Sequence, residues 1–166
     1  FFDLESTGNN FSQVRIIDGA FIKMMPDGSR EEKHLLVNPG IPIPEESRLI
    51  HGISDADVKD KPLFKEVAKD LEDFLAGCDL SGFNILRFDV PMLVEEFLRA
   101  ELDFEISERK LVDSQKIFHL MEKRTLGAAL QFYCNEELIY AHSALADTKA
   151  SLDVLIAQVA RYEGQT

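Results

Sequence analysis

The spacing of hydrophobic and polar positions changes partway along the chain and predicts two kinds of secondary structure. Up to about residue 44 the apolar positions fall in short runs, which predict strands at 1–5, within 13–25 and at 32–38. The turn signal Pro26-Asp27-Gly28-Ser29 separates the second strand from the third. Residues 38–44 hold three prolines and a glycine, so we expect them to run extended.

Beyond residue 44 most apolar positions recur at helical spacing. This pattern predicts helices at 45–50, at 64–75, from Asp89 onward, at 114–121 with Ser114 as the cap, after Thr125 and at 143–162, with short strands at 78–83 and 111–113. In the last helix the positions predicted to face inward are Leu145, Leu152, Leu155, Ile156 and Val159. Three strands followed by alternating strands and helices predict an α/β fold with a mixed central β-sheet flanked by helices.

Composition narrows the class of protein. A chain of 166 residues, 45% hydrophobic and 29% charged, is typical of one globular domain, which we expect to span residues 1–166. Cys78 and Cys134 form no disulfide framework, which favours reduced thiols and a cytoplasmic location. No apolar run approaches the roughly 20 residues that a membrane helix needs, and no signal peptide is visible, so we expect no membrane partner.

The net charge of −12 limits how the chain can bind nucleic acid. It argues against a protein that grips long duplexes by neutralising phosphates. If nucleic acid is the substrate, we expect a local grip on a chain end, with metal ions or a basic partner subunit supplying positive potential.

Two carboxylates near the start of the chain are the first candidate chemistry. Asp3 and Glu5 lie two apart on a predicted strand, so both project to one side while Leu4 faces the other. Adjacent carboxylates repel unless a cation or a proton offsets their charge. The alternative interpretation is a pair of solvated acids on an edge strand.

Two further segments carry acids. Asp89 opens a predicted helix, and its alternative role is to favour the amide dipoles there. His142 precedes Asp147 by five residues at a loop-to-helix junction, and its ordinary pKa near 6.5 suits proton transfer at neutral pH. The alternative for this pair is a surface histidine beside a salt-bridged aspartate. Four carboxylates and a histidine are the groups that a two-metal phosphodiester-cleaving site requires.

In this order and with these flanking residues, the segments resemble the three motifs of the DEDD exonuclease superfamily. The matching segments are Asp3-Leu4-Glu5-Ser6-Thr7-Gly8, residues 84–91 and residues 142–147. The histidine five residues before the last aspartate is typical of the DEDDh branch. Within it the chain is most similar to the DnaQ-like 3′–5′ exonucleases, typified by the proofreading epsilon subunit of bacterial DNA polymerase III. The resemblance implies an RNase H-like fold with helices on both sides of the sheet.

The resemblance also implies roles for individual residues. Asp3, Glu5, Asp89 and Asp147 match the carboxylates that bind two divalent ions, Mg²⁺ or Mn²⁺, and His142 matches the general base. Positions that match the substrate-binding groove are Leu4, Ser6, Thr7, Gly8, His51, Asn84 and Phe88. His51 has an equal alternative, as a residue at a helix end that interacts with backbone carbonyls.

The expected function is a metal-dependent 3′–5′ exonuclease that releases nucleoside 5′-monophosphates from single-stranded or frayed DNA, in proofreading or repair. Its expected partners are a single-stranded 3′ end, of DNA rather than RNA, and a polymerase or another replication or repair subunit. One alternative is an exoribonuclease or oligonucleotide-degrading enzyme of the same superfamily. The alternative from another class is a non-catalytic nucleic-acid-binding or polymerase-binding module.

Overall fold

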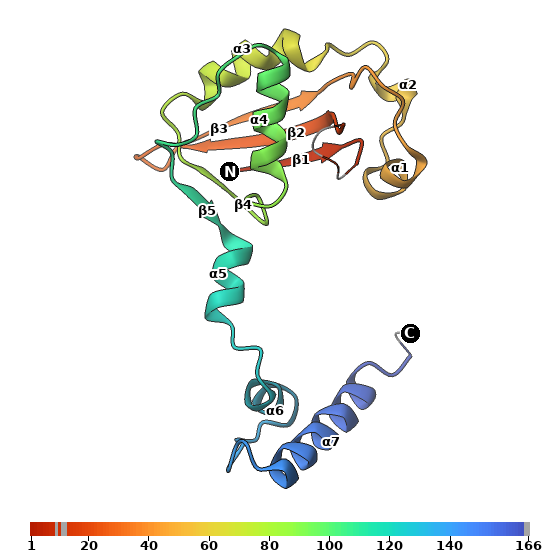
Figure 1. Ribbon diagram of the computed structural model, residues 1–166, viewed down its shortest axis with the longest axis vertical. Coiled ribbons are helices and arrows are strands. Elements are labelled where there is room, and N and C mark those ends of the chain that lie inside the picture. The colour runs from red at the N-terminus through yellow and green to blue at the C-terminus, as the bar shows by residue number, and fades with distance from the viewer. Residues whose placement is uncertain (9, 11–12, 165–166) are drawn as a thin grey trace. The chain divides into compact units, whose positions relative to one another are not determined.

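The protein is described from a computed structural model that covers residues 1–8, 10 and 13–164 (Figure 1). It forms two compact units, residues 1–117 and 118–166, which are described separately; one domain over 1–166 stays a prediction. The elements, in chain order, are β1 (Phe2–Ser6), β2 (Ile16–Met24), β3 (Arg30–Leu36), α1 (Glu45–His51), α2 (Asp55–Val58), α3 (Phe64–Leu75), β4 (Leu80–Gly82), α4 (Asp89–Arg99), β5 (Leu111–Asp113), α5 (Ser114–Met121), α6 (Leu126–Cys134) and α7 (Ala144–Arg161).

The described strands of the first unit form a three-stranded sheet and a two-stranded sheet. β1, β2 and β3 pair antiparallel in that order, whereas β4 pairs parallel with β5. The two pieces meet at Gly82, where an added Cβ would lie 2.6 Å from the carbonyl oxygen of Phe2. The α/β fold predicted from the order of strands and helices is confirmed, with the antiparallel and the parallel strands next to each other.

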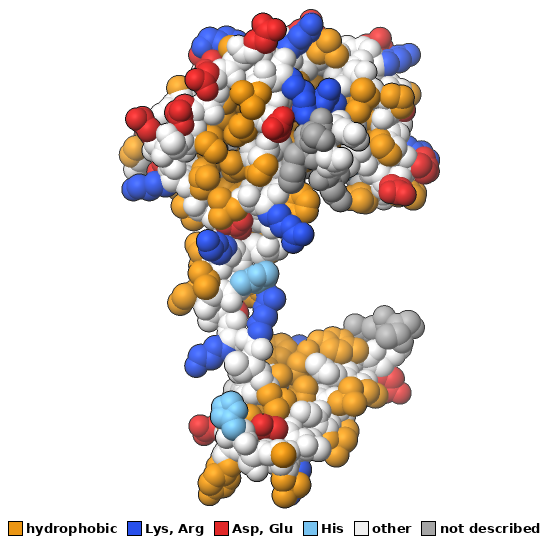
Figure 2. All heavy atoms as spheres, in the orientation of Figure 1, with side chains coloured by type: hydrophobic (Ala, Val, Ile, Leu, Met, Phe, Trp, Pro, Cys, Tyr) orange, Lys and Arg blue, Asp and Glu red, His pale blue; other side chains and the backbone are white. Residues whose placement is uncertain are grey.

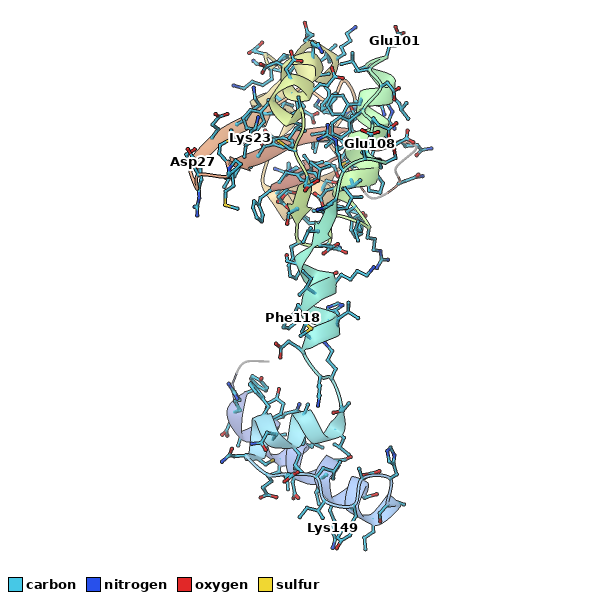
Figure 3. All side chains as sticks on the ribbon, turned by 90° about the vertical axis from the view of Figure 1, so that its left-hand side faces the viewer. Lys23, Asp27, Glu101, Glu108, Phe118 and Lys149 are labelled. Carbon is cyan, nitrogen blue, oxygen red and sulfur yellow. The ribbon has the colours of Figure 1, made fainter. Side chains whose placement is uncertain are left out.

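The hairpin between β2 and β3 follows its turn signal. Asp27, which lies at the hairpin tip in Figure 3, accepts hydrogen bonds at Oδ1 from Ser29 N–H (2.9 Å) and Ser29 Oγ (2.7 Å). An aspartate that bonds two residues ahead in this way fixes a tight turn.

Helices α3 and α4 pack on the sheet and form the main core with it. In Figure 1, α4 crosses in front of the strands. Phe97 of α4 is fully buried, with its ring edge-on to Phe64 at 5.4 Å and stacked on Phe104 at 4.4 Å. Burial of aromatic side chains at this density fixes α4 firmly, and with it the residue at which the helix begins.

The second unit is a pair of helices. Leu130 of α6 packs with Ala150 and Val154 of α7. The inward face predicted for α7 differs from the one found in this unit, because the nine-residue α6 covers only one stripe of the longer helix. The side chains predicted to face inward are 56–66% exposed: Leu145, Leu152, Leu155, Ile156 and Val159. Figure 2 shows apolar groups along the surface of this unit. Among the described residues no helix has the length and apolar character to cross a bilayer.

Candidate active site

The two acids of β1 face one cavity of about 540 Å³ in the first unit. Asp3 and Glu5 lie on the same side of the strand, while Leu4 packs against the hydrophobic core on the other. Glu5 pairs in register with Asp18 of β2, so a third carboxylate stands beside it. The strand therefore holds its acids at the cavity wall, and the residue between them is partly buried against the core.

Asp89 joins these acids from the start of α4. Its side chain is only 6% exposed, and its Oδ1 accepts a hydrogen bond from the backbone N–H of Leu4 at 3.0 Å. That bond ties the first residue of α4 to the strand between Asp3 and Glu5. Asp89 is thus a helix-opening residue, as the alternative interpretation held, and it also lines the cavity with the two acids of β1.

Crowding of these carboxylates changes their acidity. Burial raises the pKa of Asp89 to about 6, with the charges of Asp3 and Glu5 adding to the rise and the Leu4 N–H opposing it. Burial also raises the pKa of Glu5, as do Asp3 and Asp18, while His51 lowers it. A proton or a cation would relieve the repulsion among these groups.

The residues after Glu5 form a closed turn on the cavity wall. Thr7 is buried; its N–H donates to Arg15 O at 3.0 Å, and its Oγ1 accepts the Arg15 N–H at 2.9 Å. Ser6 Oγ donates to Gly8 O at 2.9 Å. The predicted substrate residues of this segment line the cavity: Leu4, Ser6, Thr7 and Gly8.

His51 presents an unpaired ring nitrogen at the same cavity. Its Nδ1 accepts the N–H of Ile53 at 3.1 Å, so a neutral ring carries its proton on Nε2. Nε2 is buried and has no hydrogen-bond partner among the described residues. The end of α1 is capped instead by Gly52, whose N–H donates to Arg48 O at 2.8 Å. The ring therefore accepts a backbone N–H and does not bond the helix-end carbonyls through Nδ1.

The loop between β4 and α4 supplies the remaining predicted groove residues. Asn84 and Phe88 both line the cavity, and Asn84 adopts a left-handed backbone with φ of 65°. A conformation of this kind costs free energy for a residue other than glycine unless its surroundings impose it.

Asp113 holds this loop, and the sequence did not single it out. Its carboxylate is 7% exposed and accepts the N–H groups of Asn84 (2.9 Å) and Leu86 (3.1 Å). Asp113 lies directly before the predicted helix, a position typical of a helix cap. Sequence patterns predicted Ser114 as the cap instead. That assignment was wrong: Ser114 is the first residue of α5 and its Oγ donates to Gly82 O, whereas Asp113 accepts the N–H of Gln115 at 3.0 Å.

His142 and Asp147 belong to the second unit and share a cavity of about 610 Å³ there. His142 lies in a left-handed conformation (φ 72°) just before α7, and Asp147 lies in the first turn of that helix. Oδ1 of Asp147 is buried without a hydrogen-bond partner among the described residues. That this pair forms one site with the three acids of the first unit stays a prediction.

The donor set fits a hard divalent cation in its chemistry. Asp3, Glu5 and Asp89 offer carboxylate oxygens whose mutual repulsion a cation would relieve, and Asp147 carries an unpaired buried oxygen. Among the residues that the structure describes, however, no three His, Cys, Asp or Glu side chains come together closely enough to hold an ion.

The family follows from comparison with known proteins. The sequence model of the exonuclease family, RNase_T, matches residues 1–155. The chain is 31% identical over 163 residues to DNA polymerase III subunit epsilon of Rickettsia prowazekii, covering 93% of this chain and 71% of that protein. The chain therefore belongs to the exonuclease family.

Two further similarities extend the comparison. The PolC-type DNA polymerase III of Caldanaerobacter subterraneus is 27% identical over 156 residues, which cover 93% of this chain and 11% of that much longer protein. The zinc-bound form of E. coli exonuclease I with single-stranded DNA superposes with a TM-score of 0.64 at 18% identity, over 99% of this chain and 40% of that one. This likeness confirms the predicted RNase H-like fold.

Proposed function

We propose that this chain is a metal-dependent 3′–5′ exonuclease domain that removes nucleoside 5′-monophosphates from single-stranded or frayed DNA. The observation that carries the proposal is the cavity where Asp3, Glu5 and Asp89 crowd together beside the turn at Thr7. A cation would relieve the mutual repulsion of these carboxylates, and the polar turn next to them suits a nucleotide. Membership of the exonuclease family supports the same chemistry.

In the proposed mechanism Asp3, Glu5, Asp89 and Asp147 would hold two divalent ions, Mg²⁺ or Mn²⁺. Such ions lower the pKa of water and stabilise both the attacking and the leaving oxygen of an in-line displacement. His142 takes the proton of the attacking water at neutral pH. The hydrogen bond from Leu4 N–H keeps the Asp89 carboxylate oriented toward the cavity.

Substrate binding is proposed for the residues that line the same cavity. The Nε2–H of His51 is buried and has no partner among the described residues, and in the proposal it donates to the terminal nucleotide when the substrate binds. Leu4, Ser6, Thr7 and Gly8 would lie against that nucleotide, with Asn84 and Phe88 along the groove. We propose DNA as the substrate because the similar proteins are named for DNA polymerase III and one solved relative is a complex with single-stranded DNA.

Two finer proposals concern the setting of the enzyme. The similarity to epsilon subunits suggests that the chain works with a polymerase or another replication or repair subunit, and a cytoplasmic location agrees with that role. The net charge of −12 supports contact with a short 3′ end, with metal ions supplying local positive charge.

The test is digestion of matched DNA and RNA oligomers, labelled at the 5′ end and resolved on a gel. Wild type with Mg²⁺ or Mn²⁺ should shorten DNA from its 3′ end one nucleotide at a time, and chelator or Asp89→Asn should stop it. Preferential shortening of RNA would favour the exoribonuclease alternative. No shortening of either strand in the presence of metal would refute the proposal in favour of a non-catalytic binding module.

A further inference from the structure

We infer that Asp113 is a positioning residue for substrate binding, because it fixes the loop that carries Asn84 into the active-site cavity. This inference rests on the proposed function and goes beyond it, since Asp113 itself does not line the cavity. Its carboxylate joins three elements at one point: the end of β5, the start of α5 and the loop between β4 and α4.

The carboxylate of Asp113 is shared between backbone N–H groups of the loop and of α5. Oδ1 accepts the N–H groups of Asn84 (2.9 Å) and Gln115 (3.0 Å), with Lys116 N–H at 3.4 Å, while Oδ2 accepts that of Leu86 (3.1 Å). Burial by itself would raise the pKa of Asp113, but these backbone donors hold it below its ordinary value. Both oxygens are therefore in use, and the group stays ionised.

The two hydrogen bonds from the loop to Asp113 constrain the loop backbone. They hold the amides of Asn84 and Leu86 on either side of Ile85, whose side chain is fully buried. Asn84 is thereby kept in its left-handed conformation (φ 65°), in which it lines the cavity. The same bonds fix the entry to α4, where Phe88 and Asp89 follow.

Asp89 has a separate anchor, and this separation makes the inference testable. Its carboxylate is oriented by Leu4 N–H at 3.0 Å, not by Asp113. Loosening the loop should therefore weaken the hold on the substrate more than the hold on metal ions.

The experiment compares two identical substitutions at opposite ends of the β4–β5 pair. Asp113→Asn puts an amide NH₂ against a backbone N–H whichever way it turns, because both oxygens of Asp113 accept bonds. Asp79→Asn is the matched control. Among the described residues Asp79 accepts a hydrogen bond from Lys110 N–H to Oδ1 at 2.8 Å, and an asparagine oxygen can accept it instead. Full-length wild type and both variants are assayed for kcat and KM on single-stranded DNA, for Mn²⁺ activation, and for amide exchange at Asn84 and Leu86.

For Asp113→Asn we expect faster exchange at Asn84 and Leu86, a raised KM for DNA and a kcat/KM lower by about 10-fold to 100-fold, as for a misplaced binding group. The Mn²⁺ concentration for half-activation should match wild type, and Asp79→Asn should behave as wild type throughout. If Asp113→Asn gives no folded protein, Asp113→Glu takes its place, with the same expectations.

Three outcomes would overturn the inference. They are unchanged exchange at Asn84 and Leu86, faster exchange with unchanged kcat/KM, and an equal loss of kcat/KM in Asp79→Asn. A wild type without nuclease activity is a different failure: it refutes the proposed function and, with it, the substrate role of Asp113.

Discussion

Two buried carboxylates of the first unit have pKa values shifted in opposite directions: Asp89 at the β1–α4 junction and Asp113 at the β5–α5 junction. Asp89 accepts one backbone N–H and faces Asp3 and Glu5, and its pKa is raised to about 6. Asp113 accepts the N–H groups of four residues, and its pKa is lowered. Both residues are largely hidden from solvent, at 6% and 7% exposure. Burial is the largest cause of the raised pKa of Asp89, whereas at Asp113 the backbone donors outweigh burial. The charge of Asp89 is destabilised and a cation would stabilise it, whereas backbone N–H groups of the protein stabilise the charge of Asp113.

The largest expected effect tests whether Asp89 binds a cation. Asp89→Asn keeps an oxygen for Leu4 N–H but removes the charge, so the fold should survive while the proposed metal site fails. We expect mononucleotide release to fall by about 10²–10⁴-fold, because a bound ion contributes several kcal/mol of charge stabilisation. The measurement is release of labelled mononucleotide under saturating Mn²⁺, with circular dichroism to check the fold. Ordinary turnover by this variant would remove Asp89 from the mechanism.

The next effect extends the contrast to the second unit. His142→Ala should slow cleavage near neutral pH by roughly 10²–10³-fold, as expected for loss of a general base, and leave metal binding intact. Exposed His119 of α5 provides the control, and His119→Ala should match wild type. Rates are measured across pH, and Mn²⁺ binding is followed by titration calorimetry. Equal rates for both variants at pH 7 would exclude His142 as the base.

A smaller effect concerns stability at Asp113. Asp113→Asn should lower the free energy of unfolding by about 1–3 kcal/mol, because a buried N–H donor loses its acceptor. Urea denaturation of the metal-free protein measures this loss, and Asp79→Asn serves again as the control. A variant as stable as wild type would mean that water satisfies those amides.

The smallest effect has the opposite sign and depends on pH. Without metal at pH 7.5, Asp89→Asn should be more stable than wild type by roughly 1–2 kcal/mol, once solvent screening is allowed for. The pKa of Asp89 is raised to about 6 in the folded protein from its ordinary value of 3.8. Between pH 6 and pH 3.8 the folded protein therefore binds a proton at Asp89 that the unfolded protein does not. Wild type therefore gains stability relative to the variant as the pH falls through 6. Thermal melts at pH 7.5 and 5.0 measure the difference, and a gap that widens at pH 5.0 would contradict the raised pKa.

Sequence patterns predicted those parts of the site that depend on local periodicity. The alternation in β1 placed Asp3 and Glu5 on one side, and helical spacing placed Asp89 at the first residue of α4. The role of Asp113 escaped prediction because it depends on amides 27 and 29 residues earlier in the chain, which no local pattern connects to it. Within the second unit, α6 packs against Ala150 and Val154 of α7, a stripe other than the one predicted to face inward.

The absence of a side chain at Gly82 lets β4 approach β1 closely. A methyl group there would lie 2.4 Å from Ile85 Cγ2 and 2.6 Å from the Phe2 carbonyl oxygen. Even alanine would therefore have to wedge β4 away from the strand that bears Asp3 and Glu5. The close approach of β4 to β1 thus depends on a position that contributes no atom beyond the main chain.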